Sequence, residues 1–413
     1  MIEIKNETEK VILVGVSLSD QDDTKESLEE LKDLVSTAGA ETVGMVIQNR
    51  EQQHPGTYVG KGKIEEIALL MEELGATGIV CDDELSPAQL NNLEKELDCK
   101  VMDRTLIILD IFAARANTSE GNIQVELAQL RYRAARLVGL RNSLSRLGGG
   151  IGTRGPGEKK LEMDRRLIHA RISQLKAELA QVQKHRELIR SKRKKDQMVV
   201  AAIVGYTNAG KSTLLNTLTD AGVLEEDKLF ATLDPTTRLL ELPGGQNILL
   251  TDTVGFIRKL PHHLIEAFKS TLEEAKYADI IIHVVDASNP QKEKQMHVVY
   301  ETLKDLGVKD QPILTLFNKQ DRIENPEILK DMKADKTLKI SAKTGKGLDD
   351  LKDELEKILC ARSILLERVF PYEKAGLIQI VRAKGQLLEE EYRGDGIYVK
   401  AFVPAEIYGK VAY

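Results

Sequence analysis

The chain has 413 residues, of which 42% are hydrophobic and 30% charged, and its formal net charge is −6. This length predicts several domains, and this composition excludes disordered and fibrous proteins. Its three widely spaced cysteines exclude a disulfide framework and favour a reducing, cytoplasmic compartment. The first residues do not read as a signal peptide, and no apolar run reaches about 18 residues, so we expect no membrane insertion.

Residues 1–117 are predicted to form an α/β domain. Strand-like runs alternate with helical runs, which predicts a small parallel sheet with helices packed on it. The glycine-rich connection 52–63 is long enough to be a functional loop, and an ordinary surface loop is the alternative. The predicted strands are Val11–Ser17, Thr42–Gln48, Gly78–Cys81 and Lys100–Met102.

Residues 118–196 are predicted to form a basic antiparallel helical hairpin. Two runs, 120–147 and 158–195, carry apolar residues at spacings of three and four, and the glycine-rich segment 148–157 interrupts them. Residues 131–195 hold 19 Lys and Arg against five Asp and Glu. This surplus predicts an arm that faces a polyanion, with a solvated charged arm as the alternative.

The glycine-rich segment contains a dinucleotide-binding pattern that we reject. Gly150, Gly152 and Gly155 match G-x-G-x-x-G, but that fingerprint requires a preceding strand and a surrounding βαβ unit. A basic helix precedes it here. We therefore interpret the segment as the tip of the hairpin, which carries Arg154.

Residues 197–362 are predicted to form a P-loop nucleotide-binding domain. A complete G-x-x-x-x-G-K-S motif follows the apolar strand Val199–Val204 and opens a helical run. In such a loop, backbone N–H groups and the lysine contact phosphates, and the serine hydroxyl is a Mg²⁺ ligand. The motif predicts a nucleoside triphosphate without identifying the base. Its residues are Gly205-Tyr206-Thr207-Asn208-Ala209-Gly210-Lys211-Ser212.

Three later motifs, each after a strand, identify the base as guanine. Asp252-Thr253-Val254-Gly255 is suited to hold Mg²⁺ through water and to contact the γ-phosphate. Asn318-Lys319-Gln320-Asp321 offers a carboxylate to the N1–H and 2-amino groups of guanine, a donor pair that adenine lacks. Ser341-Ala342-Lys343 suits a backbone contact to guanine O6. Four motifs in this order, at the carboxyl ends of strands, predict a GTP/GDP site.

The first switch is predicted at Phe230-Ala231-Thr232-Leu233-Asp234-Pro235-Thr236-Thr237. A threonine hydroxyl must reach Mg²⁺ and the γ-phosphate only in the triphosphate state. Thr232, Thr236 and Thr237 are the candidates, and we favour Thr232. We predict Lys211, Thr232 and Gly255 as catalytic residues and Ser212 and Thr232 as Mg²⁺ ligands.

Residues 363–413 are predicted to form a small C-terminal α+β domain. Two strand-like runs, 387–393 and 397–403, are joined by Gly394-Asp395-Gly396, which suits a hairpin turn. A core of this size is too small to be stable alone, so we expect it to pack on its neighbour.

Taken together, these motifs resemble the HflX family of ribosome-associated GTPases over nearly the whole chain. The resemblance rests on Pro55–Lys63, Gly148–Arg166, Phe230–Arg238 and Asp252–Phe256, of which the glycine-rich stretch is specific. It implies Mg²⁺ binding by residues matching Ser212 and Thr232. It also implies binding to the large ribosomal subunit and its rRNA, with the hairpin tip near the peptidyl-transferase centre.

The resemblance further implies that the protein splits stalled or stressed ribosomes and has no DNA partner, and we expect a cytoplasmic monomer. One alternative is a GTP-controlled, rRNA-binding assembly factor that does no splitting. Another is an RNA-modifying enzyme with a G domain. Against the latter, residues 1–117 show no paired carboxylates and no Cys/His constellation suited to base chemistry.

Phe256 occupies a position where many G proteins have a glutamine that orients the attacking water. A phenylalanine side chain cannot hydrogen-bond a water molecule, so we expect slow intrinsic hydrolysis. The missing group would come from elsewhere in the protein, from K⁺ or from the ribosome. Asn208 lies at a loop position that binds a monovalent ion in some related GTPases, which keeps K⁺ open.

Overall fold

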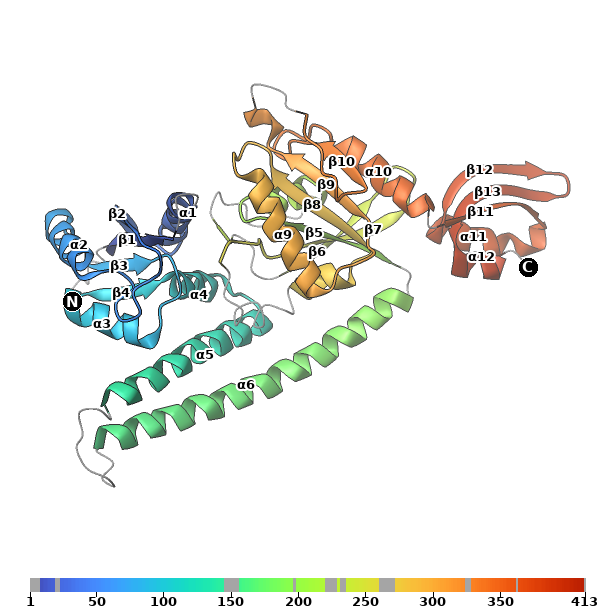
Figure 1. Cartoon of the computed structure of the whole chain (residues 1–413). Coiled ribbons are helices and arrows are strands. Elements are labelled where there is room, and N and C mark those ends of the chain that lie inside the picture. Colours follow the sequence, from blue (N-terminus) through green and yellow to red (C-terminus); the bar gives the residue numbers. More distant parts are fainter. Residues whose placement is uncertain are drawn as a thin grey trace, which may run out of the picture. The chain divides into compact units, whose positions relative to one another are not determined.

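The computed structural model describes residues 8–18, 23–144, 156–195, 198–219, 229–230, 235–259, 272–323, 328–361 and 363–411. The predicted α/β fold class is confirmed. The chain forms two compact units (Figure 1). The first comprises residues 1–190, 226–234 and 257–272, and the second comprises residues 191–225, 235–256 and 273–413.

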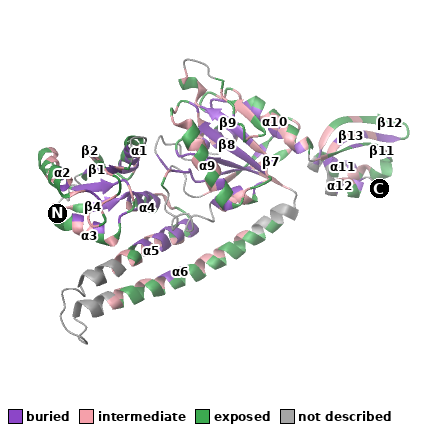
Figure 2. Ribbon diagram, in the orientation of Figure 1, coloured by how far each residue is buried: buried purple, intermediate pink, exposed green. Residues whose placement is uncertain are grey.

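The first unit contains a four-stranded parallel sheet of order β2-β1-β3-β4. Its inner strand β1 is almost continuously apolar and buried, as expected for a parallel sheet with helices on both faces (Figure 2). Ser86 and Gln89 form a capping box at the start of α3, with Pro87 in the first turn. The elements are β1 (Lys10–Ser17), α1 (Thr24–Thr37), β2 (Glu41–Asn49), α2 (Lys61–Leu74), β3 (Gly78–Cys81), α3 (Pro87–Leu97), β4 (Lys100–Asp103) and α4 (Arg104–Arg115).

The glycine-rich connection 52–63 is packed into this unit by Tyr58. The Tyr58 side chain is fully buried, and its hydroxyl donates to Asp83 at 2.8 Å. The Tyr58 backbone is left-handed, with φ of 65°, and its N–H and carbonyl pair with those of His54. The connection is therefore a structured loop around a buried aromatic ring.

Two long helices, α5 (Ser119–Leu144) and α6 (Pro156–Lys195), pack against each other. Leu127 contacts Ile172 and Leu175 in their shared apolar cluster. Early residues of α5 pair with late residues of α6, as in the Glu120–Arg186 pair at 3.0 Å, so the helices run antiparallel. The predicted tip, including Arg154, lies outside the described residues, except that Pro156 and Gly157 begin α6.

A fully buried carboxylate attaches α5 to the sheet of the first unit. Asp103 ends β4, caps α4 and accepts a hydrogen bond from the Leu106 N–H at 2.9 Å. It also accepts from the Tyr132 hydroxyl at 2.8 Å and from the Arg136 guanidinium at 2.5 Å. The base of α5 is thereby held by hydrogen bonds to a charged group, which are stronger than neutral ones.

The second unit contains a six-stranded sheet of order β10-β9-β8-β5-β7-β6. Only the β6–β7 pair of this sheet is antiparallel, so the other strands share one carboxyl edge. The elements are β5 (Val199–Gly205), α7 (Lys211–Thr219), β6 (Thr236–Glu241), β7 (Asn247–Asp252), β8 (Ile280–Asp286), α9 (Lys292–Leu306), β9 (Ile313–Asn318), η1 (Gln320–Arg322), β10 (Lys336–Lys339) and α10 (Leu348–Ala361).

A three-stranded antiparallel sheet of order β11-β13-β12 follows in the same unit. In this C-terminal region, strand β11 and helix α12 were not predicted. The described helices include none that is long and apolar enough to cross a membrane. The elements are β11 (Ser363–Phe370), η2 (Tyr372–Lys374), α11 (Ala375–Lys384), β12 (Gln386–Arg393), β13 (Gly396–Pro404) and α12 (Ala405–Val411).

Arg104→Met is expected to destabilise the first unit. Arg104 and Asp82 are each 1% exposed and 2.7 Å apart, and Arg104 also donates to Glu30 at 2.8 Å. Burial by itself would raise the pKa of Asp82, but Arg104 and Lys259 outweigh burial and hold that pKa below its ordinary value. Losing one partner of a buried pair costs about 3–5 kcal/mol.

The measurement is the opening free energy of β3 amides by native-state hydrogen exchange. Arg166→Met is the matched control, because Arg166 is 78% exposed in its pair with Glu162. That control should cost less than about 1 kcal/mol. Equal losses in the two variants would contradict a special role for the buried pair.

Candidate functional site

Gly210, in the loop between β5 and α7, and Gly255, after β7, lie where separate segments approach closely. Gly210 has φ of 96°, and a Cβ atom there would lie 2.3 Å from Nδ2 of Asn318. A Cβ atom on Gly255 would lie 2.8 Å from Cα of Thr207 and 2.9 Å from Nζ of Lys211. Motifs that are far apart in the sequence therefore lie close to one another, with no room for a larger side chain at either glycine.

Lys211 is only 7% exposed and donates to the Tyr206 carbonyl at 2.8 Å. Burial lowers the pKa of Lys211 to about 8; nearby Lys319 contributes, and Asp252 opposes the shift. A buried ammonium beside a loop of backbone N–H groups is suited to bind a phosphate.

Ser212 and Asp252, from two of the predicted motifs, lie in contact. The Ser212 hydroxyl donates to the Asp252 carboxylate at 2.9 Å, and Asp252 is fully buried at the end of β7. The strand pairing sets this approach, because Asp252 lies opposite Ile203 on β5. A hydroxyl and a carboxylate are hard oxygen donors, and the pair therefore fits Mg²⁺.

The first switch is described only in part. Ala231, Thr232, Leu233 and Asp234 lie outside the described residues. The other two threonine candidates, Thr236 and Thr237, begin β6, and the Thr237 hydroxyl hydrogen-bonds that of Thr251 at 3.0 Å. Phe230 is buried, and its ring meets that of Phe112 edge-to-face at 4.7 Å.

Phe256 is a buried structural residue that connects two motifs. Its N–H donates to the Gly205 carbonyl at 3.1 Å, and its carbonyl accepts from the Thr207 N–H at 2.8 Å. Its side chain is 2% exposed. The backbone of Phe256 thus joins the segment after Asp252 to the phosphate-binding loop.

The amide of Asn318 connects the phosphate-binding loop to the guanine-recognition motifs. Its Nδ2 donates to the Ala209 carbonyl at 2.8 Å, and its Oδ1 accepts from the Ala342 N–H at 2.9 Å. The Ser341 hydroxyl donates to Asp321 at 2.6 Å. This hydrogen bond lowers the pKa of the exposed Asp321 carboxyl group.

Sequence reasoning missed Thr217, a residue that supports this site. The Thr217 hydroxyl, in α7, donates to the Ala342 carbonyl at 2.9 Å. Thr217 therefore binds the carbonyl of the segment predicted to contact O6, whereas Asn318 binds the N–H of the same residue, Ala342. No local signal marks Thr217, because its partner is 125 residues away in the sequence.

Two basic residues that follow Phe256 were also missed. Within the first unit, Lys259 donates to Asp82 at 2.5 Å and to Asp83 at 2.8 Å, and Arg258 donates to Asp23 at 2.5 Å. Since their partners lie more than 170 positions away, the sequence pattern does not indicate them.

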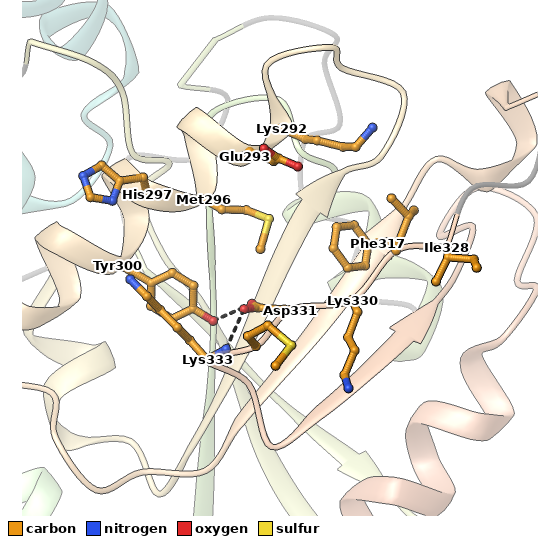
Figure 3. Close-up of a pocket in the computed structure, with 12 residues that line it drawn as sticks. Lys292, Glu293, Met296, His297, Tyr300, Phe317, Ile328, Lys330, Asp331 and Lys333 are labelled. Carbon is orange, nitrogen blue, oxygen red and sulfur yellow. Dashed lines mark hydrogen bonds between the residues drawn. The ribbon is translucent and has the colours of Figure 1, made fainter.

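A separate hollow of about 370 Å³ lies between α9 and the segment 328–333 (Figure 3). Phe317, which precedes Asn318, lines it, but the phosphate- and guanine-binding motifs do not. On one wall, Asp331 accepts from the hydroxyls of Tyr300 at 2.6 Å and Thr315 at 2.7 Å. This wall is joined to β9 through Thr315, and none of the predicted nucleotide-binding residues that the structure describes lines the hollow.

Three family sequence profiles match the chain in succession. They are described as GTP-binding GTPase N-terminal (residues 25–113), GTP-binding GTPase Middle Region (residues 115–193) and 50S ribosome-binding GTPase (residues 200–319). Together these matches cover most of α5 and α6 and the nucleotide motifs up to Lys319.

Curated relatives match along nearly their whole length. GTPase HflX of Lacrimispora saccharolytica is 68% identical over 412 residues, covering 100% of this chain and 97% of the relative. GTPase HflX of Caldanaerobacter subterraneus subsp. tengcongensis is 50% identical, covering 98% and 94%. The crystal structure of the SsGBP–GDP complex is 26% identical, covers 84% of this chain and 98% of that one, and has a TM-score of 0.49.

Binding of GDP to the nucleotide-free protein is expected to take up a proton at pH 9. The pKa of Lys211 is about 8 before binding, and phosphate oxygens favour the ammonium form, which raises it. Below pH 8 the proton is already present, so affinity should fall only as the pH rises above 8, by up to about tenfold per unit. Calorimetry at pH 7 and 9, in buffers of different ionisation enthalpy, measures the uptake. Equal proton uptake at both pH values would contradict this assignment.

Asp321→Asn is expected to shift preference from guanine towards xanthine. Asparagine cannot accept both guanine donors, whereas its amide can pair with the 2-oxo group of xanthine. Competition of GDP and XDP against a fluorescent GDP analogue measures the change. Unchanged GDP affinity in the variant would show that Asp321 does not contact the base.

Proposed function

The chain is a GTPase of the HflX family, and we propose that it hydrolyses GTP on the large ribosomal subunit and splits stalled or stressed ribosomes. The observation that supports this best is that Asn318 joins three of the four nucleotide motifs, within a match to a profile described as 50S ribosome-binding GTPase. A ribosome-bound enzyme of this kind would act in the cytoplasm.

In this proposal, residues 205–212 bind the phosphates and Asp321 binds guanine. Lys211 neutralises the β- and γ-phosphate oxygens, and the Gly255 N–H contacts the γ-phosphate. Ser212 and Thr232 would hold Mg²⁺, which supplies charge neutralisation at the phosphates when bound. The remaining motif residues shape the pocket through their backbone groups.

The chain lacks a water-orienting side chain at Phe256, which is buried and connects backbone segments. Hydrolysis therefore needs a group from outside that position. A K⁺ ion at Asn208 and contact with the ribosome are the two sources that we propose. Either one would make turnover depend on the partner or on the monovalent salt.

The basic helices α5 and α6 are proposed to contact rRNA. The two helices pack on each other through a narrow apolar seam, and many α6 side chains remain exposed (Figure 2). Arg165 and Arg166 are among these exposed residues. Exposed guanidinium groups on a long arm suit phosphate contacts along an RNA helix.

Light scattering of 70S ribosomes mixed with the protein and GTP tests the splitting activity. Falling intensity is expected, because separated subunits scatter less than whole ribosomes. Unchanged intensity with co-sedimentation would favour the alternative, a GTP-controlled rRNA-binding assembly factor. The GTPase rate should be higher in the presence of large ribosomal subunits than in their absence.

A double Arg165→Ala/Arg166→Ala variant tests the rRNA contact. Each lost phosphate contact should reduce the slope of log affinity against log salt by about 0.7–0.9. Lys357→Ala is the matched control, because Lys357 is 69% exposed on α10 in a pair with Glu354. Equal slopes for wild type and the double variant would exclude these two arginines from the contact.

A further inference from the structure

We infer that Asp286 is a positioning residue for guanine-nucleotide binding, acting through the ammonium group of Lys319. No sequence motif singled out Asp286, which lies at the end of β8. The inference depends on the proposed nucleotide site and assigns a further residue to it.

The contact is a short ion pair that is largely shielded from water. Nζ of Lys319 lies 2.7 Å from Oδ2 of Asp286, and the two side chains are 13% and 15% exposed. The other carboxylate oxygen, Oδ1, accepts from the N–H and the hydroxyl of Ser288, at 3.0 and 2.6 Å. Asp286 is thus fixed by the turn after β8 and presents one oxygen to Lys319.

The strand pairing brings these two residues together. Asp286 lies opposite Asn318 in the parallel β8–β9 pair, and the Ala287 N–H donates to the Asn318 carbonyl at 3.0 Å. Lys319 follows directly, in the left-handed conformation with φ of 61° and ψ of 33°. This backbone is unfavourable for a lysine, so the surrounding structure must hold it.

Lys319 is expected to lay its aliphatic stem and charge across the plane of the base, as the motif predicts. A lysine side chain has several rotatable bonds, and holding it in one arrangement costs conformational entropy. The carboxylate of Asp286 holds the ammonium end before the nucleotide arrives. Such preorganisation reduces the ordering cost of binding.

The charges nearby give this contact a second effect. Lys319 is close enough to Lys211 to help lower the pKa of that residue. A carboxylate on Lys319 offsets the repulsion between the two ammonium groups. Asp286 therefore allows two cations to remain near one nucleotide.

Asp286→Asn is the test variant because it changes little besides the ion pair. Asparagine keeps Oδ1 as an acceptor for Ser288, but it presents an NH₂ group to the Lys319 ammonium. We expect GDP and GTP to bind about tenfold more weakly, with faster dissociation, which is the usual effect of losing a charged hydrogen bond. Stopped-flow fluorescence with a labelled GDP and a labelled non-hydrolysable GTP analogue measures both.

The sign of the change separates positioning from a simple charge effect. Removing a negative charge near a polyanionic ligand would by itself strengthen nucleotide binding. Weaker binding therefore supports positioning, whereas unchanged or tighter binding overturns it. Asp279→Asn, the same substitution just before β8, is the control, because Asp279 accepts from the Val200 N–H at 3.0 Å. The nucleotide affinity of this control variant should stay within about twofold of wild type.

A double-mutant cycle with Lys319→Met tests whether Asp286 acts through Lys319. Methionine keeps an aliphatic stem without the ammonium group, so Asp286→Asn should have almost no further effect in that background. Additive losses would overturn the inference, because Asp286 would then act by another route.

The ratio of GDP to IDP affinities distinguishes this inference from failure of the site itself. IDP lacks the 2-amino group that Asp321 reads, so the ratio should stay at the wild-type value in Asp286→Asn. A ratio that falls towards one would mean that the substitution displaced the Asp321 loop, and it would overturn the positioning role. If wild-type protein bound neither GDP nor GTP, the proposed site would fail before Asp286 was tested.

Discussion

The nucleotide site depends on one amide group, the side chain of Asn318. It donates to the carbonyl of Ala209 and accepts from the N–H of Ala342, so it joins the phosphate-binding loop to the segment predicted to contact guanine O6. Gly210 must be a glycine partly because this amide lies where a Cβ atom would be. Asn318 thereby joins three segments, of which the phosphate-binding loop lies 109 positions away in the sequence and the Ala342 segment 24 positions away.

Charge is distributed around this site in a way that isolated motifs do not reveal. Lys211 is buried with a lowered pKa, Asp321 accepts a hydrogen bond from the Ser341 hydroxyl, and Lys319 is paired with Asp286. Each group is thus held in a defined state before a nucleotide binds. The same principle appears in the first unit, where the buried carboxylate of Asp103 attaches α5 to the end of β4. In both units, ion pairs and hydrogen bonds to charged groups connect segments that are far apart in the sequence.

Some expectations could be formed from the sequence because they depend on local chemistry. The G-x-x-x-x-G-K-S loop and the alternating strands follow from neighbouring residues, and the structure has β3 at the predicted residues. The expectations for Ala231–Asp234 and for the tip at Arg154 stay predictions, because those residues lie outside the described part of the chain. The strand β6 was not predicted, since it pairs antiparallel to β7 and its solvent-facing residues weaken the apolar pattern.

The sequence by itself determined the fold class, the nucleotide motifs and the family, because these depend on residue types at fixed local spacings. Only the tertiary structure decided which distant groups support the motifs. Asp286, Thr217 and the Asp103 attachment of α5 all act on partners whose distance in the sequence carries no pattern. The role of Phe256 was also decided there, since burial and backbone pairing to Gly205 and Thr207 depend on how the strands are ordered in the sheet. Strand order is a property of the whole chain, and it brings these groups within hydrogen-bonding distance.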